Sequence, residues 1–433
     1  MRQRGENSRI DALWAAAIAV ALHAAPVAVA LAIGIEGTSE WHDQVSYHFP
    51  VIERFAAELP HPDLRDYQSA TTPGYHLMMA VLLRAGAPMM GLHLVNALFG
   101  CLLVGLAAWM VTRFSSRRVG IAAGAVLAFS PYALSSSIAL TTDNLGTLLV
   151  MAAFFLQLRI STGEWQGMSA RVVLGGVAAA LAAFVRQVFA YTAALPCVAV
   201  VARWCAAREL PPRRYMVLSL LSLLPALALV AYFAWLWGGL VPPAFRGAHG
   251  SGANPVTPVY ALAVACVWGV PAFLGIPGFL RALCCRRSLV LGAVAVAACS
   301  AVPSSYLQDV RWGGVLWTAS RFFPNVLDRS LLIVGLAAAA AVSFGAVLRM
   351  WARSDDMARR GAVVYALFLC VGAIVAQTAN QQCFERYLQP IMALSCVLAA
   401  AAVAGPSLRT WPMWVVAAVA LACSFYNVFL IGA

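Results

Sequence analysis

Isolated charged side chains beside long apolar runs are the residues of this chain best suited to chemistry. Asp43, in Trp41-His42-Asp43-Gln44, follows shortly after the first apolar run, and Arg186 interrupts an apolar tract. A charge near membrane depth costs at least a few kcal/mol when it is unpaired, so such residues need partners or a water-filled cavity. A carboxylate can take a proton from a hydroxyl group, and a guanidinium fork fits a phosphate. The residue types therefore predict acid–base and phosphate chemistry beside a membrane.

Asp43 has two possible roles. It could be a general base at the height of the membrane surface. It could instead cap an interfacial amphipathic helix from Val45 to Leu59. We favour the general base, because residues 36–78 form the largest polar island in a chain otherwise dominated by apolar runs.

Three further charged positions carry alternatives. Asp143 follows two threonines and begins an apolar run, so it is either a helix N-cap or a second carboxylate in the same cavity. Arg186 needs an anion, which is either a bidentate phosphate or the carboxylate of Asp143 or Glu385. Arg386 also needs an anion, which is either a bidentate phosphate or the carboxylate of Glu385, its neighbour in sequence.

The histidines raise the question of a metal site. The spacing of His42, His48, His61 and His76 matches no zinc signature, and ordinary interfacial histidines are the simpler interpretation. His249 lies in a Gly-rich and Pro-rich stretch, where backbone can approach a ligand closely. We predict no metal site from these residues.

Composition decides the class of protein that must position these groups. Hydrophobic residues make up 62% of the chain and charged residues only 11%, and the mean hydropathy is +0.81. Such a chain is a polytopic membrane protein built from α-helices. Its net charge of +12 is carried by arginines scattered singly or in pairs, which indicates membrane topology and not nucleic-acid binding. The eleven cysteines show neither metal-ligand nor disulfide spacing.

Apolar stretches long enough to cross a membrane number about thirteen. They lie near 11–35, 89–112, 119–138, 144–159, 171–185, 187–203, 215–238, 257–280, 288–303, 329–348, 361–378, 387–404 and 411–431. We expect a single integral membrane domain over residues 1–433, with interfacial helices in the first outer loop, 36–78. Residues 73–88 are either interfacial or re-entrant.

Arginine alternates from loop to loop along these spans. The groups on one side are Arg2/Arg4/Arg9, Arg113/Arg117/Arg118, Arg159/Arg171, Arg203/Arg208/Arg213/Arg214, Arg281/Arg286/Arg287, Arg349/Arg353/Arg359/Arg360 and Arg409. The positive-inside rule assigns this side to the cytoplasm. The loops 36–72, 141–144, 186–187, 239–256, 304–328 and 379–386 then share the outer side, and they hold the candidate residues.

Four short motifs in this order resemble the dolichyl-phosphate-glucose α-1,2-glucosyltransferase family of GT-C glycosyltransferases. The resemblance is thin but extends over most of the chain. It rests on Asp43 with His48 and Pro50 followed by Thr71-Thr72-Pro73-Gly74-Tyr75, on Arg186-Gln187, on Leu307-Gln308-Asp309-Val310-Arg311, and on Glu385-Arg386-Tyr387.

The resemblance implies an inverting transfer of a hexose. The donor would be a polyprenyl-phosphate sugar, and the acceptor a hydroxyl of a lipid-linked or membrane glycan on the outer or lumenal face. It implies Asp43 as the base and Arg186 and Arg386 as the donor phosphate ligands. The other substrate contacts would be His42, Gln44, His48, Asp143, Gln187, His249, Asp309, Arg311, Glu385 and Tyr387. The arginines make a metal or other cofactor dispensable, and no Gly-rich nucleotide loop is present.

A transporter or flippase of lipid-linked sugars is the alternative from another class. It would be expected to carry polar residues through the membrane midplane and on both faces, whereas here they gather on one side. Arginine-only basicity and high alanine content point to a prokaryotic source, and hence to the plasma (inner) membrane with the active site on its periplasmic side.

Overall fold

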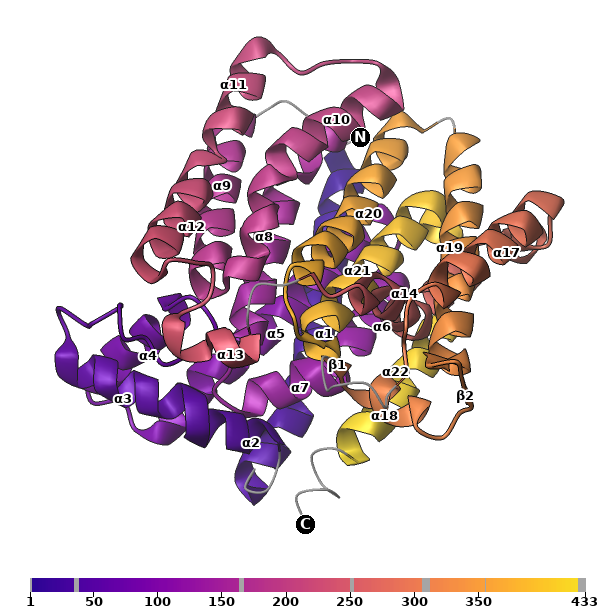
Figure 1. The fold of residues 1–433 in the computed structure, drawn as a ribbon. Coiled ribbons are helices and arrows are strands. Elements are labelled where there is room, and N and C mark those ends of the chain that lie inside the picture. The colour runs from indigo at the N-terminus through magenta and orange to yellow at the C-terminus, as the bar shows by residue number, and fades with distance from the viewer. Residues whose placement is uncertain are drawn as a thin grey trace.

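The computed structural model describes residues 2–34, 39–162, 167–249, 253–305, 312–354 and 356–426, and these residues are predominantly helical (Figure 1). In the first half the helices are α1 (Arg2–Ile33), α2 (Ser39–Asp43), η1 (Gln44–His48), α3 (Phe49–Glu58), α4 (Gly74–Arg84), α5 (Met89–Phe114), α6 (Arg117–Ala128), α7 (Pro131–Ile138), α8 (Asp143–Thr162), α9 (Met168–Val185), η2 (Gln187–Ala194), α10 (Leu195–Ala207), α11 (Arg213–Leu221) and α12 (Leu224–Trp237). The prediction of an all-α membrane protein is confirmed.

The second half adds more helices and four very short strands. The helices are η3 (Pro243–Phe245), α13 (Arg246–His249), α14 (Val256–Trp268), α15 (Pro271–Leu274), α16 (Phe279–Leu283), α17 (Arg286–Ser300), α18 (Val315–Ser320), α19 (Leu331–Ala352), α20 (Met357–Thr378), α21 (Glu385–Ala404), η4 (Gly405–Ser407) and α22 (Trp411–Phe425). The strands are β1 (Trp312–Gly313), β2 (Asn325–Val326), β3 (Arg329–Ser330) and β4 (Cys383–Phe384); β1 pairs in parallel with β4, and β2 pairs antiparallel with β3.

In the part of the chain that the structure describes, each predicted span coincides with one helix or with two or three consecutive helices, but several of these helices are short. Within the described residues, eight helices are long and apolar enough to cross a membrane, and the pair α6 and α7 makes a ninth that is bent by 61°. The bend falls at Pro131, which lacks the N–H that a continuous helix needs. The span predicted for 257–280 likewise breaks after Trp268, before Pro271. Residues 74–84 form an 11-residue helix, too short to span a bilayer.

Helix α21 is the centre of the bundle. In the apolar stretch of α21, 89% of the residues are buried inside the protein, whereas the value for α1 is 22%. Small side chains allow this close packing, since Ala399, Ala400 and Ala401 are fully enclosed. The first residues of α21 are Glu385 and Arg386. The most enclosed of the eight long apolar helices therefore carries a carboxylate and a guanidinium at one end.

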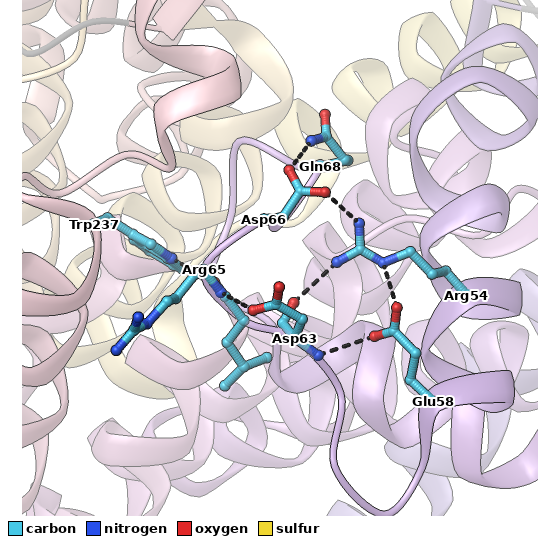
Figure 2. A network of polar contacts seen from close by, with 8 residues as sticks. Arg54, Glu58, Asp63, Arg65, Asp66, Gln68 and Trp237 are labelled. Carbon is cyan, nitrogen blue, oxygen red and sulfur yellow. Dashed lines mark hydrogen bonds and ion pairs between the residues drawn. The ribbon is translucent and has the colours of Figure 1, made fainter.

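Helices α2, α3 and α4 lie across one end of the bundle (lower left in Figure 1). Val51, Ile52 and Phe55 form the buried face of α3 and pack with α4. A polar network then fixes the loop that follows α3 (Figure 2). In it, Arg54 contacts Glu58 and Asp66 and donates to the Asp63 carbonyl, while Trp237 of α12 donates to Leu64. Helices α2, α3 and α4 and the loop of residues 59–73, which we call the platform, are therefore fixed to the bundle by side-chain contacts.

The loops rich in arginine lie at the opposite end from this platform, beside the N-terminus of α1 (Figure 1). They join α10 to α11 and α19 to α20. We predict that this end faces the cytoplasm. A membrane-impermeant thiol reagent should label Ser39→Cys in intact cells and Ser354→Cys only in broken ones, with the parent chain as background. Labelling of Ser354→Cys but not Ser39→Cys in intact cells would reverse the orientation.

Candidate active site

A cavity of about 520 Å³ opens at the platform end of the bundle. We call it the arginine–aspartate cavity. Its lining is drawn from segments far apart in the sequence, and it includes Asp43, Tyr47, His48, Ser69, Ala70, Thr71, Thr142, Asp143, Arg186, Gln187, Val188, Ala190, Tyr191, Leu240, Val241, Phe245, Ala376, Ala379, Asn380, Gln382, Phe384, Arg386 and Tyr387. Five of the six loops predicted to share the outer side thus meet at one place.

Asp43 and Arg386 form the more accessible of two ion pairs in the cavity. A guanidinium nitrogen of Arg386 donates to Asp43 Oδ2 over 2.7 Å, and the two side chains are 24% and 25% exposed. Asp43 ends α2, whereas Arg386 lies in the first turn of α21. The platform is therefore joined to the central helix by an ion pair that a ligand in the cavity can reach.

Asp143 and Arg186 form the second pair, which is more enclosed. Arg186 donates to Asp143 Oδ1, and their side chains are only 9% and 10% exposed. The guanidinium carbon also lies 4.0 Å from the centroid of the Tyr387 ring, a cation–π contact. Of the two partners proposed from sequence for Arg186, the structure shows Asp143 and not Glu385.

The chain breaks its helical path to place Arg186. Helix α9 ends at Val185, Arg186 is extended, and a 3₁₀ segment follows. The loop of residues 69–72 fills the break, because Thr72 donates to the Ala183 carbonyl over 2.7 Å and Gln187 donates to the Ala70 carbonyl over 2.8 Å. Irregular backbone in a membrane protein is tolerated where it lines a cavity, as it does here.

Glu385 lies outside the cavity, although it precedes Arg386. It is fully buried and accepts hydrogen bonds from the hydroxyls of Tyr132 and Tyr260 and from the backbone of Leu316 and Trp317. Successive residues of a helix point about 100° apart, which follows from 3.6 residues per turn. Glu385 and Arg386 therefore face different surroundings, and the expectation that they are partners is wrong.

His48 links the cavity to two buried side chains. His48 Nδ1 lies 2.9 Å from His76 Nε2, and His76 Nδ1 lies 2.6 Å from the Tyr67 hydroxyl. Burial and, next, the positive charges of Arg386 and Arg186 lower the pKa of His48 to about 3. Burial and then His48 hold the pKa of His76 well below its usual value. Both rings are neutral around pH 7, so His48 brings no positive charge to the cavity.

This neutrality predicts that acid destabilises the fold. The unfolded histidines take up protons below pH 6.5 while the folded ones do not, so stability falls as pH drops from 6.5 toward 3. The slope is about 1.4 kcal/mol per pH unit for each fully protected ring. Melting in detergent at pH 7.5, 6.5, 5.5 and 4.5 measures it, and His76→Gln should flatten the curve. An equally steep curve for this variant would show that other groups cause the loss.

The remaining predicted residues divide into three groups. Gln187 and Tyr387 line the cavity. Gln44 does not, because it is buried with its side-chain oxygen bonded to the Leu140 N–H, and His42 is exposed beside Ser46. Asp309, Arg311 and the side chain of His249 lie outside the described residues.

Several lining residues were not singled out from sequence. These residues are Tyr47, Tyr191, Asn380 and Gln382. Asn380 and Gln382 lie in the predicted outer loop 379–386, which was a usable signal. Tyr47 and Tyr191 had none, since aromatic residues are ordinary at a membrane interface.

The fold and the cavity together define the class: this is a polytopic α-helical integral membrane protein with a polar, arginine-bearing cavity at one end of its bundle. No protein-family model and no curated protein matches the chain in sequence. Among solved structures it is similar to ArnT from Cupriavidus metallidurans in the apo state, with a TM-score of 0.40 and 14% sequence identity. The match covers 89% of this chain and 77% of that one.

Proposed function

We propose that this protein is a membrane glycosyltransferase. It moves a hexose from a polyprenyl-phosphate donor to a hydroxyl of a lipid-linked or membrane glycan acceptor, at the outer face of a prokaryotic plasma membrane. One observation carries the proposal: two arginine–aspartate pairs face a single cavity where the bundle meets the platform. Such a cavity offers both a base and phosphate ligands at the height of a lipid headgroup.

Asp43 is the base in this proposal. Its carboxylate takes the proton of the acceptor hydroxyl, the acceptor oxygen bonds to the anomeric carbon, and the bond from that carbon to the phosphate oxygen breaks. The configuration at the anomeric carbon is inverted, and polyprenyl phosphate leaves with the negative charge. The guanidinium groups of Arg386 and Arg186 stabilise that charge. Asp43 is preferred over Asp143 because its side chain is the more exposed of the two.

Donor binding also activates the base. Without a ligand, Arg386 donates to Asp43 and so holds the carboxylate in an ion pair. A donor phosphate competes for the guanidinium, which binds phosphate in a bidentate geometry. Once Arg386 turns to the phosphate, Asp43 is free to accept the proton of the acceptor. Phosphate binding and base activation are thus one event.

The apolar part of the lining suits a lipid-borne donor. Leu240, Val241, Phe245, Ala376 and Ala379 share the cavity with the charged residues. The isoprenoid chain nearest the phosphate would pack on them, while the hydrocarbon tail remains in the bilayer. A soluble nucleotide sugar has no hydrocarbon chain that could pack on this surface.

Transfer of labelled sugar tests the proposal. Purified protein is incubated with polyprenyl-phosphate [¹⁴C]hexose and a membrane lipid extract, and the products are separated by chromatography. We expect label in a larger glycolipid and stoichiometric release of polyprenyl phosphate. Intact labelled donor moved across a vesicle membrane would instead identify a transporter. Mass spectrometry of lipids from cells with and without the gene then names the sugar, because the unused donor accumulates when the gene is absent.

A further inference from the structure

A second cavity, of about 640 Å³, lies where α16 and the start of α17 meet the end of α19. We call it the basic cavity. Its lining residues are Gly278, Arg281, Ala282, Cys285, Arg286, Arg287, Arg349, Met350 and Arg353. Helices α17 and α19 lie at the edge of the bundle in Figure 1, and the lining residues Arg349, Met350 and Arg353 come from the end of α19 that precedes the loop to α20. It is therefore separate from the arginine–aspartate cavity.

Five of these residues are arginines, and none is acidic. Within the described part of the chain no ion pair to any of the five is seen, although arginines elsewhere at this end have carboxylate partners, as Arg117 has in Asp11. Like charges gathered this closely repel one another unless an anion is bound between them. Arg349 is also held in place, since it donates to the Ala282 carbonyl over 3.0 Å and to Ser288. Five positive charges thus gather around one cavity, and one of them, Arg349, is fixed by hydrogen bonds.

The surroundings of the basic cavity are apolar and uncovered. Leu280 of α16 is 62% exposed, and Leu289 and Val290 of α17 are 69% and 59% exposed. On a membrane protein such side chains meet lipid chains. A ligand in this place contacts guanidinium groups at one end and hydrocarbon at the other.

We propose that the basic cavity binds the phosphate headgroup of an anionic phospholipid. The planar forks of Arg281, Arg286 and their neighbours match phosphate oxygens, and the exposed leucines and valine accompany the acyl chains. Basic cavities between membrane helices favour such headgroups over zwitterionic ones. A free phosphate carries the same kind of charge, but it has no acyl chain to contact Leu280, Leu289 and Val290.

Native mass spectrometry of the purified full-length protein tests this site without any sugar donor. The protein in neutral detergent is titrated with phosphatidylglycerol, with phosphatidylcholine of the same chain length, and with inorganic phosphate. The test variant carries Arg281→Gln and Arg286→Gln. The control carries Arg118→Gln and Arg213→Gln, which remove the same charge from exposed positions outside the basic cavity.

We expect one phosphatidylglycerol to be retained per protein, with at least tenfold weaker binding in the test variant and unchanged binding in the control. Phosphatidylcholine should not compete. An equal loss of binding in both variants would reduce the effect to general charge and overturn the site. Displacement of the lipid by millimolar inorganic phosphate would overturn the lipid as ligand. Size-exclusion profiles of both variants confirm that they are folded.

Discussion

Asp43→Asn should slow sugar transfer by about 10²-fold or more, because an amide cannot take the proton of the acceptor hydroxyl. The change keeps the size of the side chain and an oxygen that can still accept from Arg386, so folding and donor binding should be nearly intact. Turnover of labelled polyprenyl-phosphate hexose by the purified variant measures the effect. A fall in kcat with an unchanged KM for the donor is the expected signature.

Glu53→Gln is the matched control for this loss. Glu53 lies on α3, is exposed, and is not among the cavity residues. A solvated surface charge contributes little, so this variant should transfer sugar at the parent rate. Near-normal turnover by Asp43→Asn, together with inactivity of Asp143→Asn, would instead make Asp143 the base.

Arg386→Lys should weaken donor binding and slow transfer, each by roughly 10-fold or more, since a hydrogen bond to a charged group is worth about 1.5–3 kcal/mol. Lysine keeps the positive charge and can still pair with Asp43, but it lacks the planar fork that grips two phosphate oxygens. Binding of the lipid donor and single-turnover transfer measure the two effects separately. Full activity with unchanged donor affinity would rule out a bidentate contact.

Arg54→Lys is the control for replacing a planar guanidinium group outside the cavity. Arg54 uses its guanidinium on Glu58, Asp66 and the Asp63 carbonyl, away from the arginine–aspartate cavity (Figure 2). This variant should be slightly less stable and fully active. Arg186 is less suited to the test, because its removal leaves the enclosed carboxylate of Asp143 without a partner, at a cost of about 3–5 kcal/mol.

Much of the fold could be predicted because its signal is local. Apolar runs of sufficient length must become helices in a bilayer, and Pro131 marks the bend between α6 and α7. Breaks such as the one after Trp268 were harder to predict. There the apolar run continues through Gly269, which follows α14 and packs so closely on Cys396 of α21 that a Cβ would lie 2.7 Å from the sulfur, and Pro271 then begins α15.

The membership of the arginine–aspartate cavity could be predicted in part, because polar residues in an apolar chain are few and arginine alternation puts them on one side. Which aspartate pairs with which arginine could not be predicted. Asp43 and Arg386 are 343 positions apart, and nothing local relates α2 to the start of α21. Neighbours in sequence were poor guides for the same reason: Gln44 turns into the protein toward Leu140, although Asp43 faces the cavity.

The parallel pairing of β1 with β4 joins the loop before α18 to the start of α21. Gly314, with φ of +140°, lets that loop pass so close to Glu385 that any Cβ would collide with the carboxylate. Residues 312–317 are thus held rigidly against the start of α21, where Arg386 lies, and Phe322, just after α18, is 84% exposed. An antibody fragment that grips the surface around Phe322 should therefore inhibit noncompetitively, by displacing Arg386 without entering the cavity.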